Sequence, residues 1–251
     1  MIIIKSEQEI RIMRQVGAIV AKILKTLQLH LRPGMKTEEL DVIAAREVEG
    51  LGAKPSFKGY RGFPANICVS VNDEIVHGIP GKRVLKEGDI VSIDFGAIFM
   101  GFHGDASVTV GIGNISREAR RLIETTEGAL KTGIATARPG ARLGDISAAI
   151  QHHAESKGYS VVREYTGHGI GREMHEEPQI TNFGLPGQGP VLKKGMALAL
   201  EPMVNTGGWL TRLDDNHWTV LTNDGSLSAH FEHTIAIDDG EPEILTAVDD
   251  G

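Results

Sequence analysis

Residues 84–94 read VLKEGDIVSID, and residues 191–201 read VLKKGMALALE. In both stretches a short apolar run, typical of a β-strand, follows a glycine, and a carboxylate closes the run six residues after that glycine. An acidic side chain at the end of a buried strand is unfavourable unless it is paired or binds a metal. The two stretches therefore predict two related half-sites that face one centre.

The repeat extends towards the N-terminus of each stretch. Arg32-Pro33-Gly34 recurs as Arg138-Pro139-Gly140, 106 positions later, and the carboxylate phrase recurs after 107 positions. A solenoid needs more and shorter repeats, so two copies of this size indicate a pseudo-symmetric unit. We expect one domain over residues 1–251, with related halves at about 1–112 and 113–251.

Composition limits the class of protein. A length of 251 residues suits one large domain, and no segment is long enough to span a membrane. The apolar start at Ile2–Ile4 is too short for a signal peptide, and the net charge of −7 argues against nucleic-acid binding. The only cysteine, Cys68, cannot form an internal disulfide. We expect a cytoplasmic protein without membrane or specific nucleic-acid contacts.

Apolar spacing and capping residues predict four helices. They are expected between Ser6 and Pro33, from Thr37 to Gly52, from Ser116 to Pro139 and from Asp145 to Lys157. Strand-like runs occupy residues 67–71, 90–100, 106–110, 196–204, 218–221 and 226–237, and Asn223-Asp224-Gly225 favours a hairpin between the last two. The sequence thus predicts an α+β fold, with helices on one face of a curved antiparallel sheet and a site on the other.

Two acidic residues flank the expected hairpin of the first half. If its register is symmetric about Phe99 and Met100, Asp94 and Asp105 lie directly opposite each other, with Cβ atoms about 5 Å apart. At this short distance two carboxylates repel each other unless one is protonated or a metal bridges them. Taken alone, an acidic pair beside a turn is more often solvated.

The second half supplies His168, Glu201 and Glu232, the two glutamates in apolar, strand-like surroundings. Together with the two aspartates they form an oxygen-rich ligand set with one imidazole, whose charge about two divalent cations would balance. Such ions, about 3.5–4 Å apart, share carboxylates and a water. The pattern predicts a dinuclear metal site.

Several longer motifs are specific in combination. They are Asn72-Asp73-Glu74-Ile75-Val76-His77-Gly78-Ile79-Pro80, Ile93-Asp94-Phe95-Gly96, Gly101-Phe102-His103-Gly104-Asp105, Gly167-His168-Gly169-Ile170-Gly171, Met174-His175-Glu176-Glu177-Pro178, Glu201-Pro202-Met203 and Phe231-Glu232-His233-Thr234. Over nearly its whole length the chain resembles the bacterial type I methionine aminopeptidases, which are dinuclear metallopeptidases of the pita-bread fold. That resemblance implies a monomeric enzyme that removes the N-terminal methionine from peptides and nascent chains, with a preference for a small second residue.

The resemblance also assigns roles to individual residues. It implies that the metal ligands are Asp94, Asp105, His168, Glu201 and Glu232. Glu201 is also implied as the proton shuttle, while His77 contacts the scissile-bond nitrogen and His175 steadies the oxygen of the tetrahedral intermediate. The implied wall of the methionine pocket consists of Tyr60, Phe63, Cys68, Met174, Trp218, His77 and His175. Without the resemblance, core packing is the favoured explanation of the apolar members.

Cofactors and partners follow from the same resemblance. The two metal ions can be iron, manganese, cobalt or zinc, and a structural monovalent cation is expected near Asn72, Glu74 and Ser228. A ribosome contact is a hypothesis for a basic face of the first helix, formed by Arg11, Arg14, Lys22 and Lys25. Gly96 and Phe95 depart from the threonine and smaller aliphatic residue common in bacterial relatives, which affects the surroundings of the metal rather than its ligands.

Two alternatives to methionine removal stay open. A related aminopeptidase or dipeptidase would accept proline after the cleaved bond, and a peptide-binding protein on the same fold would not cleave at all. The second alternative is weakened because all five implied ligands are present, whereas such relatives typically lose them.

Overall fold

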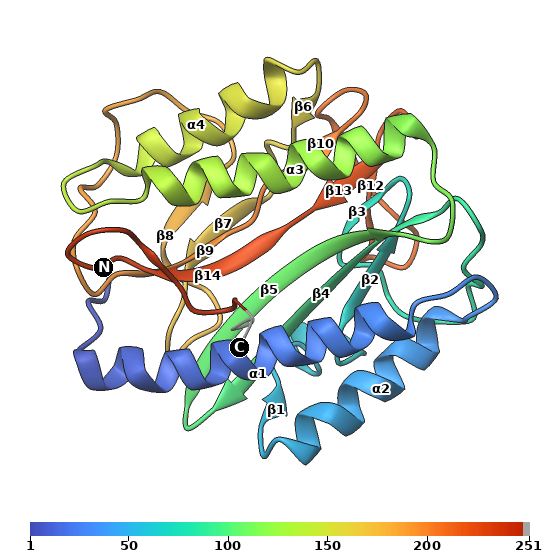
Figure 1. Ribbon diagram of the computed structural model, residues 1–251, viewed down its shortest axis with the longest axis horizontal. Coiled ribbons are helices and arrows are strands. Elements are labelled where there is room, and N and C mark those ends of the chain that lie inside the picture. The colour runs from blue at the N-terminus through green and yellow to red at the C-terminus, as the bar shows by residue number, and fades with distance from the viewer. Residues whose placement is uncertain (248–251) are drawn as a thin grey trace.

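The computed structural model describes residues 1–247. Within that range a long antiparallel sheet carries four helices on one of its faces (Figure 1). The helices are α1 (Glu7–His30), α2 (Thr37–Gly50), α3 (Arg117–Thr136) and α4 (Leu143–Glu155). All four were predicted; only α4 is displaced, because it begins and ends two residues earlier than expected.

Local capping explains where two of the helices begin. The Ser6 hydroxyl accepts a hydrogen bond from the backbone N–H of Glu9, and the Glu9 carboxylate accepts one from the backbone N–H of Ser6. This reciprocal arrangement satisfies two donors that a helix start leaves free. Ser116 caps α3 in the simpler way, by accepting from the N–H of Ala119.

The main sheet is antiparallel at each of its pairings among the described residues. Its strands run in the order β1-β4-β5-β14-β9-β7-β8, with β2 beside β4 and β15 beside β14. Their bounds are β1 Lys54–Pro55, β2 Cys68–Val71, β4 Ile90–Phe99, β5 Phe102–Gly111, β7 Thr166–Gly169, β8 Glu176–Thr181, β9 Ala197–Leu200, β14 Glu232–Ala236 and β15 Glu243–Ile244.

Two smaller sheets extend the structure beside the main one. One has the order β13-β10-β6 and the other β11-β12-β3. These strands are β3 Glu74–Val76, β6 Ser160–Val161, β10 Met203–Asn205, β11 Thr211–Leu213, β12 Val220–Thr222 and β13 Ser228–His230. The fold is therefore α+β, as predicted.

The register expected for the first hairpin is wrong. Phe99 pairs with Phe102, so Met100 and Gly101 form the turn, and Asp94 lies opposite Ser107 rather than opposite Asp105. Met100 and Gly101 both have positive φ, 49° and 78°. Two such residues are what a tight two-residue hairpin turn requires. The strand after the turn begins at Phe102, four residues earlier than predicted.

Two long strands predicted from residues 196–204 and 226–237 are each divided. The first breaks at Glu201-Pro202 into β9 and β10, and the second breaks at Phe231 into β13 and β14. Proline has no N–H to donate to a ladder, which explains the first break. The breaks face each other, since the N–H of Phe231 donates to the carbonyl of Pro202. At these breaks the first segment passes from the main sheet into the small one, and the second passes from the small sheet into the main one.

The hairpin expected at residues 223–225 does not form. β12 pairs with β11 and β3, whereas β13 pairs with β10, so the two strands on either side of the turn enter different sheets. The turn itself exists, because the Thr222 hydroxyl donates to the carbonyl of Ser226. Asp224 also accepts from the backbone N–H of Gly208, which ties the turn to the β10–β11 connection.

The two copies of the repeated sequence make equivalent contacts. The N–H of Gly34 donates to Leu85 over 2.8 Å, and the N–H of Gly140 donates to Leu192 over 3.0 Å. Isolated bridges likewise pair Lys36 with Val84, and Arg142 with Val191. The division of the chain at about residue 112 stays a prediction.

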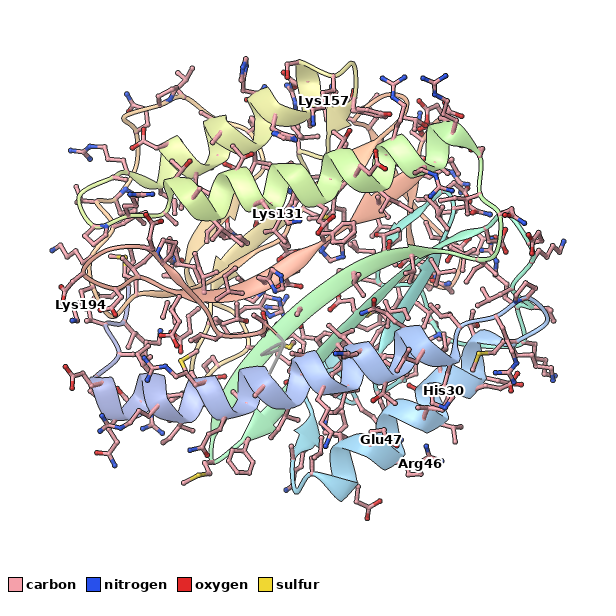
Figure 2. All side chains as sticks on the ribbon, viewed as in Figure 1. His30, Arg46, Glu47, Lys131, Lys157 and Lys194 are labelled. Carbon is pink, nitrogen blue, oxygen red and sulfur yellow. The ribbon has the colours of Figure 1, made fainter. Side chains whose placement is uncertain are left out.

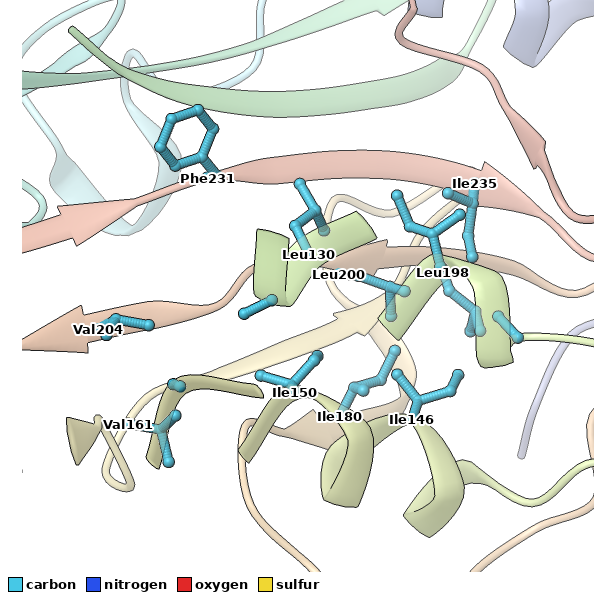
Figure 3. Packing of buried hydrophobic residues seen from close by; sticks show 14 of the residues in the cluster. Leu130, Ile146, Ile150, Val161, Ile180, Leu198, Leu200, Val204, Phe231 and Ile235 are labelled. Atoms are coloured by element: carbon cyan, nitrogen blue, oxygen red, sulfur yellow. The ribbon is translucent and has the colours of Figure 1, made fainter. Parts of the chain in front are cut away.

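The two largest apolar cores lie between the helices and the sheet. α1 and α2 cover one of them, and α3 and α4 cover the other, part of whose buried side chains are drawn in Figure 3. Charged side chains such as Arg46, Lys131 and Lys157 point away from the sheet (Figure 2). With one face of the sheet closed in this way, the opposite face is available for a site.

Candidate metal centre

The sheet register places two predicted ligand positions close together. Asp94 on β4 pairs with Ser107 on β5, and Ser107 in turn pairs with Glu232 on β14. Residues directly opposite each other share a face of the sheet. Ser107 is small and leaves room between the two carboxylates. On the other side of Asp94, the paired residue on β2 is Cys68.

A neighbouring row of the sheet brings in the next two residues. Asp105 pairs with Gly96 across the β4–β5 ladder, and His168 on β7 pairs with Ala199 on β9. Donor atoms of Asp105, His168 and Glu232 all lie within 4.8 Å of one another. All three side chains are buried, with relative exposures of 4%, 5% and 2%. Three strands far apart in sequence thus meet at one small centre.

Glu201 follows directly after β9 and faces the same centre. Its Oε1 lies 3.6 Å from Nε2 of His168, and its Oε2 lies 3.7 Å from Nε2 of His230. The break in the strand at Glu201-Pro202 ends the ladder at the point where the Glu201 carboxylate projects into this centre.

The buried carboxylates of this centre include oxygens without a hydrogen-bond partner among the described residues. Oδ1 of Asp94, Oδ1 of Asp105 and Oε1 of Glu232 are buried and accept no hydrogen bond from the described residues. Burial raises the pKa of Asp94 to about 7, and burial together with repulsion between the carboxylates raises the pKa values of Asp105, Glu201 and Glu232. A divalent cation fits this donor set, since it would supply the missing partner and charge.

His168 is oriented and protonated as a metal ligand requires. Nδ1 of His168 lies 2.9 Å from the carbonyl of Gly169, so this nitrogen donates and Nε2 is free to bind a metal. Burial lowers the pKa of His168 to about 4. The ring is neutral at pH 7, the form in which imidazole coordinates metals.

His175 stands at the open side of the centre. Its ring centroid lies 4.3 Å from that of His168, and its Nδ1 lies 2.8 Å from the hydroxyl of Tyr60. Partial burial and the neighbouring His168 lower the pKa of His175 to about 3. If the Tyr60 hydroxyl donates to Nδ1, the proton of the neutral ring is on Nε2, which then serves as a hydrogen-bond donor.

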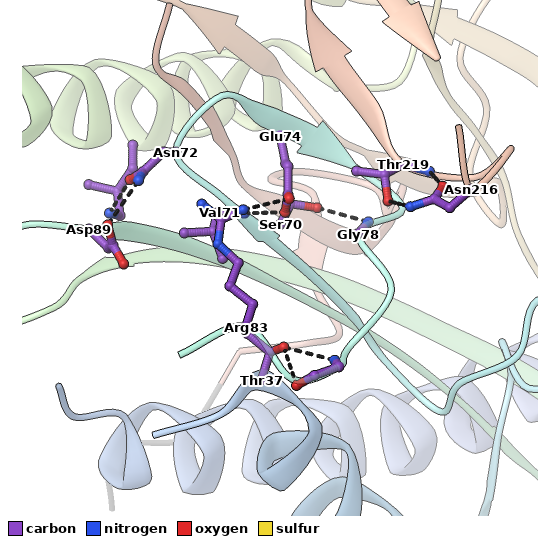
Figure 4. A network of polar contacts seen from close by, with 12 residues as sticks. Thr37, Ser70, Val71, Asn72, Glu74, Gly78, Arg83, Asp89, Asn216 and Thr219 are labelled. Atoms are coloured by element: carbon purple, nitrogen blue, oxygen red, sulfur yellow. Dashed lines mark hydrogen bonds and ion pairs between the residues drawn. The ribbon is translucent and has the colours of Figure 1, made fainter. Parts of the chain in front are cut away.

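His77 is held by an unusual backbone conformation. Its φ of 60° lies in the left-handed region, which residues other than glycine seldom adopt and which is often found at functional sites. Next to it, the N–H of Gly78 donates to the hydroxyl of Ser70 over 3.1 Å, one of the polar contacts shown in Figure 4. Burial lowers the pKa of His77 to about 4, so this ring is also neutral at pH 7.

A cavity opens from the candidate metal centre and is lined by every residue predicted to be catalytic, metal-binding or substrate-binding. It is lined by Phe57, Tyr60, Arg61, Phe63, Cys68, His77, Asp94, Asp105, His168, Met174, His175, Glu201, Trp218 and Glu232. The aromatic wall is well packed, since the rings of Phe63 and Trp218 meet edge to face at 5.2 Å. One cavity thus has an acidic end and an apolar end.

Three residues near the centre were missed by sequence analysis. Phe57 and Arg61 line the cavity, and buried His230 approaches Glu201. His230 lies two residues before Glu232 on the same strand-like run, and that spacing was an available signal. No pattern in the sequence marked Phe57 or Arg61, because the loop between β1 and β2 that carries them has no periodicity.

Comparison with known proteins defines the class. Residues 11–239 match the model of metallopeptidase family M24. The chain belongs to this family, and its fold is the pita-bread fold. Membership of a metallopeptidase family and the buried cluster of Asp105, His168 and Glu232 both indicate divalent-metal binding.

The individual relatives are more specific. Methionine aminopeptidase 1 of Bacillus subtilis is 54% identical over 248 residues, covering 99% of this chain and 100% of the relative. Methionine aminopeptidase of Clostridium acetobutylicum is also 54% identical, covering 98% and 99%. The crystal structure of methionine aminopeptidase from Thermotoga maritima superposes with a TM-score of 0.97 at 47% identity, covering 98% and 100%.

More distant structures share only the fold. Prolidase from Pyrococcus horikoshii superposes with a TM-score of 0.80 at 23% identity, covering 98% of this chain but 64% of the prolidase.

None of the helices among residues 1–247 is long and apolar enough to cross a membrane.

Proposed function

We propose that this chain is an aminopeptidase that removes the N-terminal methionine from peptides and nascent proteins and prefers a small second residue. The observation that carries the proposal is the junction of a carboxylate–imidazole cluster with an apolar cavity. Methionine aminopeptidases that are about half identical to this chain over its whole length support the proposal. A peptide substrate follows from an aminopeptidase activity.

Five residues are proposed to hold two divalent ions of iron, manganese, cobalt or zinc: Asp94, Asp105, His168, Glu201 and Glu232. When bound, such ions supply Lewis acidity at the substrate carbonyl and a nucleophile derived from water at neutral pH. The buried carboxylate oxygens without partners are the support for this assignment.

Glu201 is proposed to move the proton. Burial and the neighbouring Asp94 and Asp105 carboxylates raise its pKa, which makes it a better base than an exposed glutamate. It accepts a proton from the attacking water and passes it to the nitrogen of the leaving peptide. His77, which lines the same cavity, is proposed to contact that nitrogen.

His175 is proposed to stabilise the developing oxyanion. In this role the Tyr60 hydroxyl donates to Nδ1, and Nε2 carries the proton that is donated to the substrate carbonyl oxygen. A fixed neutral donor of this kind is most useful where negative charge grows during the reaction. Tyr60 therefore orients His175 as well as lining the cavity.

The side chain of methionine is proposed to occupy the apolar end of the cavity. Phe63, Cys68, Met174 and Trp218 contribute apolar and sulfur-containing surface there. An unbranched thioether adapts well to such a surface.

A structural monovalent cation is proposed near Asn72, Glu74 and Ser228. The backbone N–H of Ser228 donates to the carbonyl of Asn72, so the two segments lie side by side. Opposite Ser228 in the β10–β13 ladder lies Asn205, whose buried Oδ1 has no partner among the described residues. An ion held mainly by backbone oxygens would satisfy it.

A ribosome contact is proposed for the basic face of α1. Arg11, Arg14, Lys22 and Lys25 are all exposed on this helix, and Arg14 also pairs with Glu243. Charge reversal at the four positions should lower binding to ribosomes, and a pull-down with unchanged yield would contradict the proposal. With this role we also propose a cytoplasmic location.

The activity is tested with three peptides and metal-stripped protein. Met-Ala-Ser, Met-Pro-Ser and Ala-Pro-Ser are incubated with each divalent metal separately, and the released residue is identified by mass spectrometry. Metal-dependent release of methionine alone is the expected result. Release of alanine from Ala-Pro-Ser would favour a proline-directed enzyme, and no cleavage with any metal would favour a peptide-binding protein.

A further inference from the structure

A buried ion pair connects the start of the chain with the edge of the cavity. Nζ of Lys5 lies 2.5 Å from Oε2 of Glu176, and the two side chains are only 3% and 4% exposed. Lys5 does not line the metal cavity, whereas Met174 and His175, the two residues that precede Glu176, both do. Burying two charges is costly unless their geometry is well satisfied.

The Glu176 carboxylate organises the loop between β7 and β8, residues 170–175. Its Oε1 accepts hydrogen bonds from the backbone N–H groups of Arg172 and Glu173, at 2.9 and 3.4 Å. Its other oxygen is the one that meets Lys5. One carboxylate thus closes the turn of the loop on one side and binds the N-terminal segment on the other.

The N-terminal segment is itself fixed, so it can act as a support. The N–H of Lys5 donates to the carbonyl of Gly195 over 2.7 Å, and Nζ of Lys5 also donates to the carbonyl of Ile3. Gly195 belongs to the second copy of the repeated sequence, residues 191–201, and leads into β9. The segment therefore lies between the strand that precedes Glu201 and the β7–β8 loop.

Packing around the ion pair leaves no room for an additional side-chain carbon. A Cβ at Gly171 would lie 2.5 Å from Cε of Lys5 and 2.6 Å from Oε1 of Glu176. The glycine permits the backbone of the loop to approach the pair closely. Such close contact restricts the positions that the loop can adopt.

We propose that Lys5 is a positioning residue, which acts through Glu176 to hold Met174 and His175 against the substrate cavity. This inference rests on the proposed function for the roles of these two residues. The ammonium neutralises a buried carboxylate that would otherwise draw the loop towards water. Loss of the ammonium displaces the donor on His175 and the thioether wall on Met174 together.

The test uses Lys5→Met, which keeps the length of the side chain and removes its charge, and Glu176→Gln, which keeps the Oε1 acceptor. The double variant Lys5→Met/Glu176→Gln removes both charges. Lys131→Met is the matched control, because Lys131 forms an exposed ion pair with Glu127 on α3. All are assayed as metal-loaded full-length protein.

Two readouts are measured. For Lys5→Met, kcat/KM on Met-Ala-Ser is expected to fall about tenfold or more, since small displacements of catalytic groups have large effects. Tryptic cleavage after Arg172, an exposed residue of the loop, is expected to accelerate by about tenfold or more because the loop opens locally. Glu176→Gln should change both in the same direction, and the double variant should recover part of the loss seen in Lys5→Met.

The outcomes separate this inference from the proposed function. Proteolysis after Arg172 reports on the loop even if the parent protein cleaves none of the peptides. The inference is overturned if Lys5→Met changes both readouts by no more than Lys131→Met does. It is also overturned if tryptic cleavage accelerates equally throughout the chain, since that indicates general unfolding.

Discussion

Cys68 and Asp94 face each other directly across the β2–β4 ladder, so the only thiol of the chain lies beside a proposed metal ligand. Burial, followed by the negative charge of Asp94, raises the pKa of Cys68 well above its ordinary value. The thiolate is the reactive form of cysteine, and its population here is very small at neutral pH.

Cys68 should therefore be unreactive in the folded protein. At pH 8, alkylation by iodoacetamide is expected to be slower than in denatured protein by a factor of about 100 or more. Mass spectrometry of the intact chain follows the reaction directly. Alkylation of the native protein at the rate of the denatured one would contradict the packing described for the cavity.

Glu201→Gln tests the proposed proton transfer. Glutamine keeps one oxygen and the volume of the side chain but cannot accept a proton, so kcat should fall by a factor of about 10²–10⁴ with saturating metal. Steady-state kinetics on Met-Ala-Ser measure the loss. Glu127→Gln on α3 changes an exposed glutamate of the same kind and should leave kcat unaltered. A decrease below tenfold would argue against a proton-transfer role for Glu201.

The carboxylate cluster should make the metal-free protein sensitive to pH. The pKa of Asp94 is about 7 in the folded state and 3.8 ordinarily, so between these values the folded state holds more protons than the unfolded state. Stability from this group is therefore lost as the pH rises through that window. Histidines with lowered pKa values act in the opposite direction but are common to parent and variant.

Asp94→Asn isolates this contribution. Relative to the parent, the metal-free variant should gain about 1–4 kcal/mol of unfolding free energy between pH 5 and pH 8, because one pKa unit corresponds to about 1.4 kcal/mol. Urea denaturation in the presence of a chelator measures it. With added Mn²⁺ the parent should become more stable than the variant, since the parent binds the metal more tightly. Equal pH dependence of the two proteins would contradict the effect of burial on the pKa of Asp94.

The helices could be predicted because their signals are local. Ser6 and Ser116 act as caps as their sequence neighbours indicate. The main errors concern strands, and they arise where partners distant in sequence decide the outcome. At Glu201-Pro202 and Phe231 the chain leaves one sheet for another, and the apolar pattern of a strand is the same in both sheets.

In the proposed site, too, local signals could be read from the sequence, whereas contacts between distant residues could not. The sequence indicated the acidic residues because a carboxylate in an apolar run is conspicuous. It placed Asp94 opposite Asp105, whereas the observed register sets Asp105 opposite Gly96. Lys5 and Glu176 are 171 residues apart, and no periodicity could join them. Phe57 was overlooked because only the folded loop directs its ring into the cavity.

Gly96 provides a test of how Phe57 and the metal centre share space. A Cβ at position 96 would lie 2.9 Å from Cε1 of Phe57, 3.0 Å from Cβ of Ser56 and 3.2 Å from Oδ1 of Asp105. Gly96→Ala should therefore lower the unfolding free energy by about 1–3 kcal/mol, as is usual for overpacking, and weaken metal binding by displacing Asp105.

Addition of Phe57→Leu to Gly96→Ala should recover part of both losses, because the smaller side chain vacates the space that the new methyl group needs. Urea denaturation and metal titration of the parent, the two single variants and the double variant complete a double-mutant cycle. Residues in contact are expected to show a coupling energy of about 0.5–3 kcal/mol. Strictly additive effects would mean that the alanine methyl is accommodated by movement of Ser56 or Asp105 and that Phe57 does not limit the space beside the metal centre.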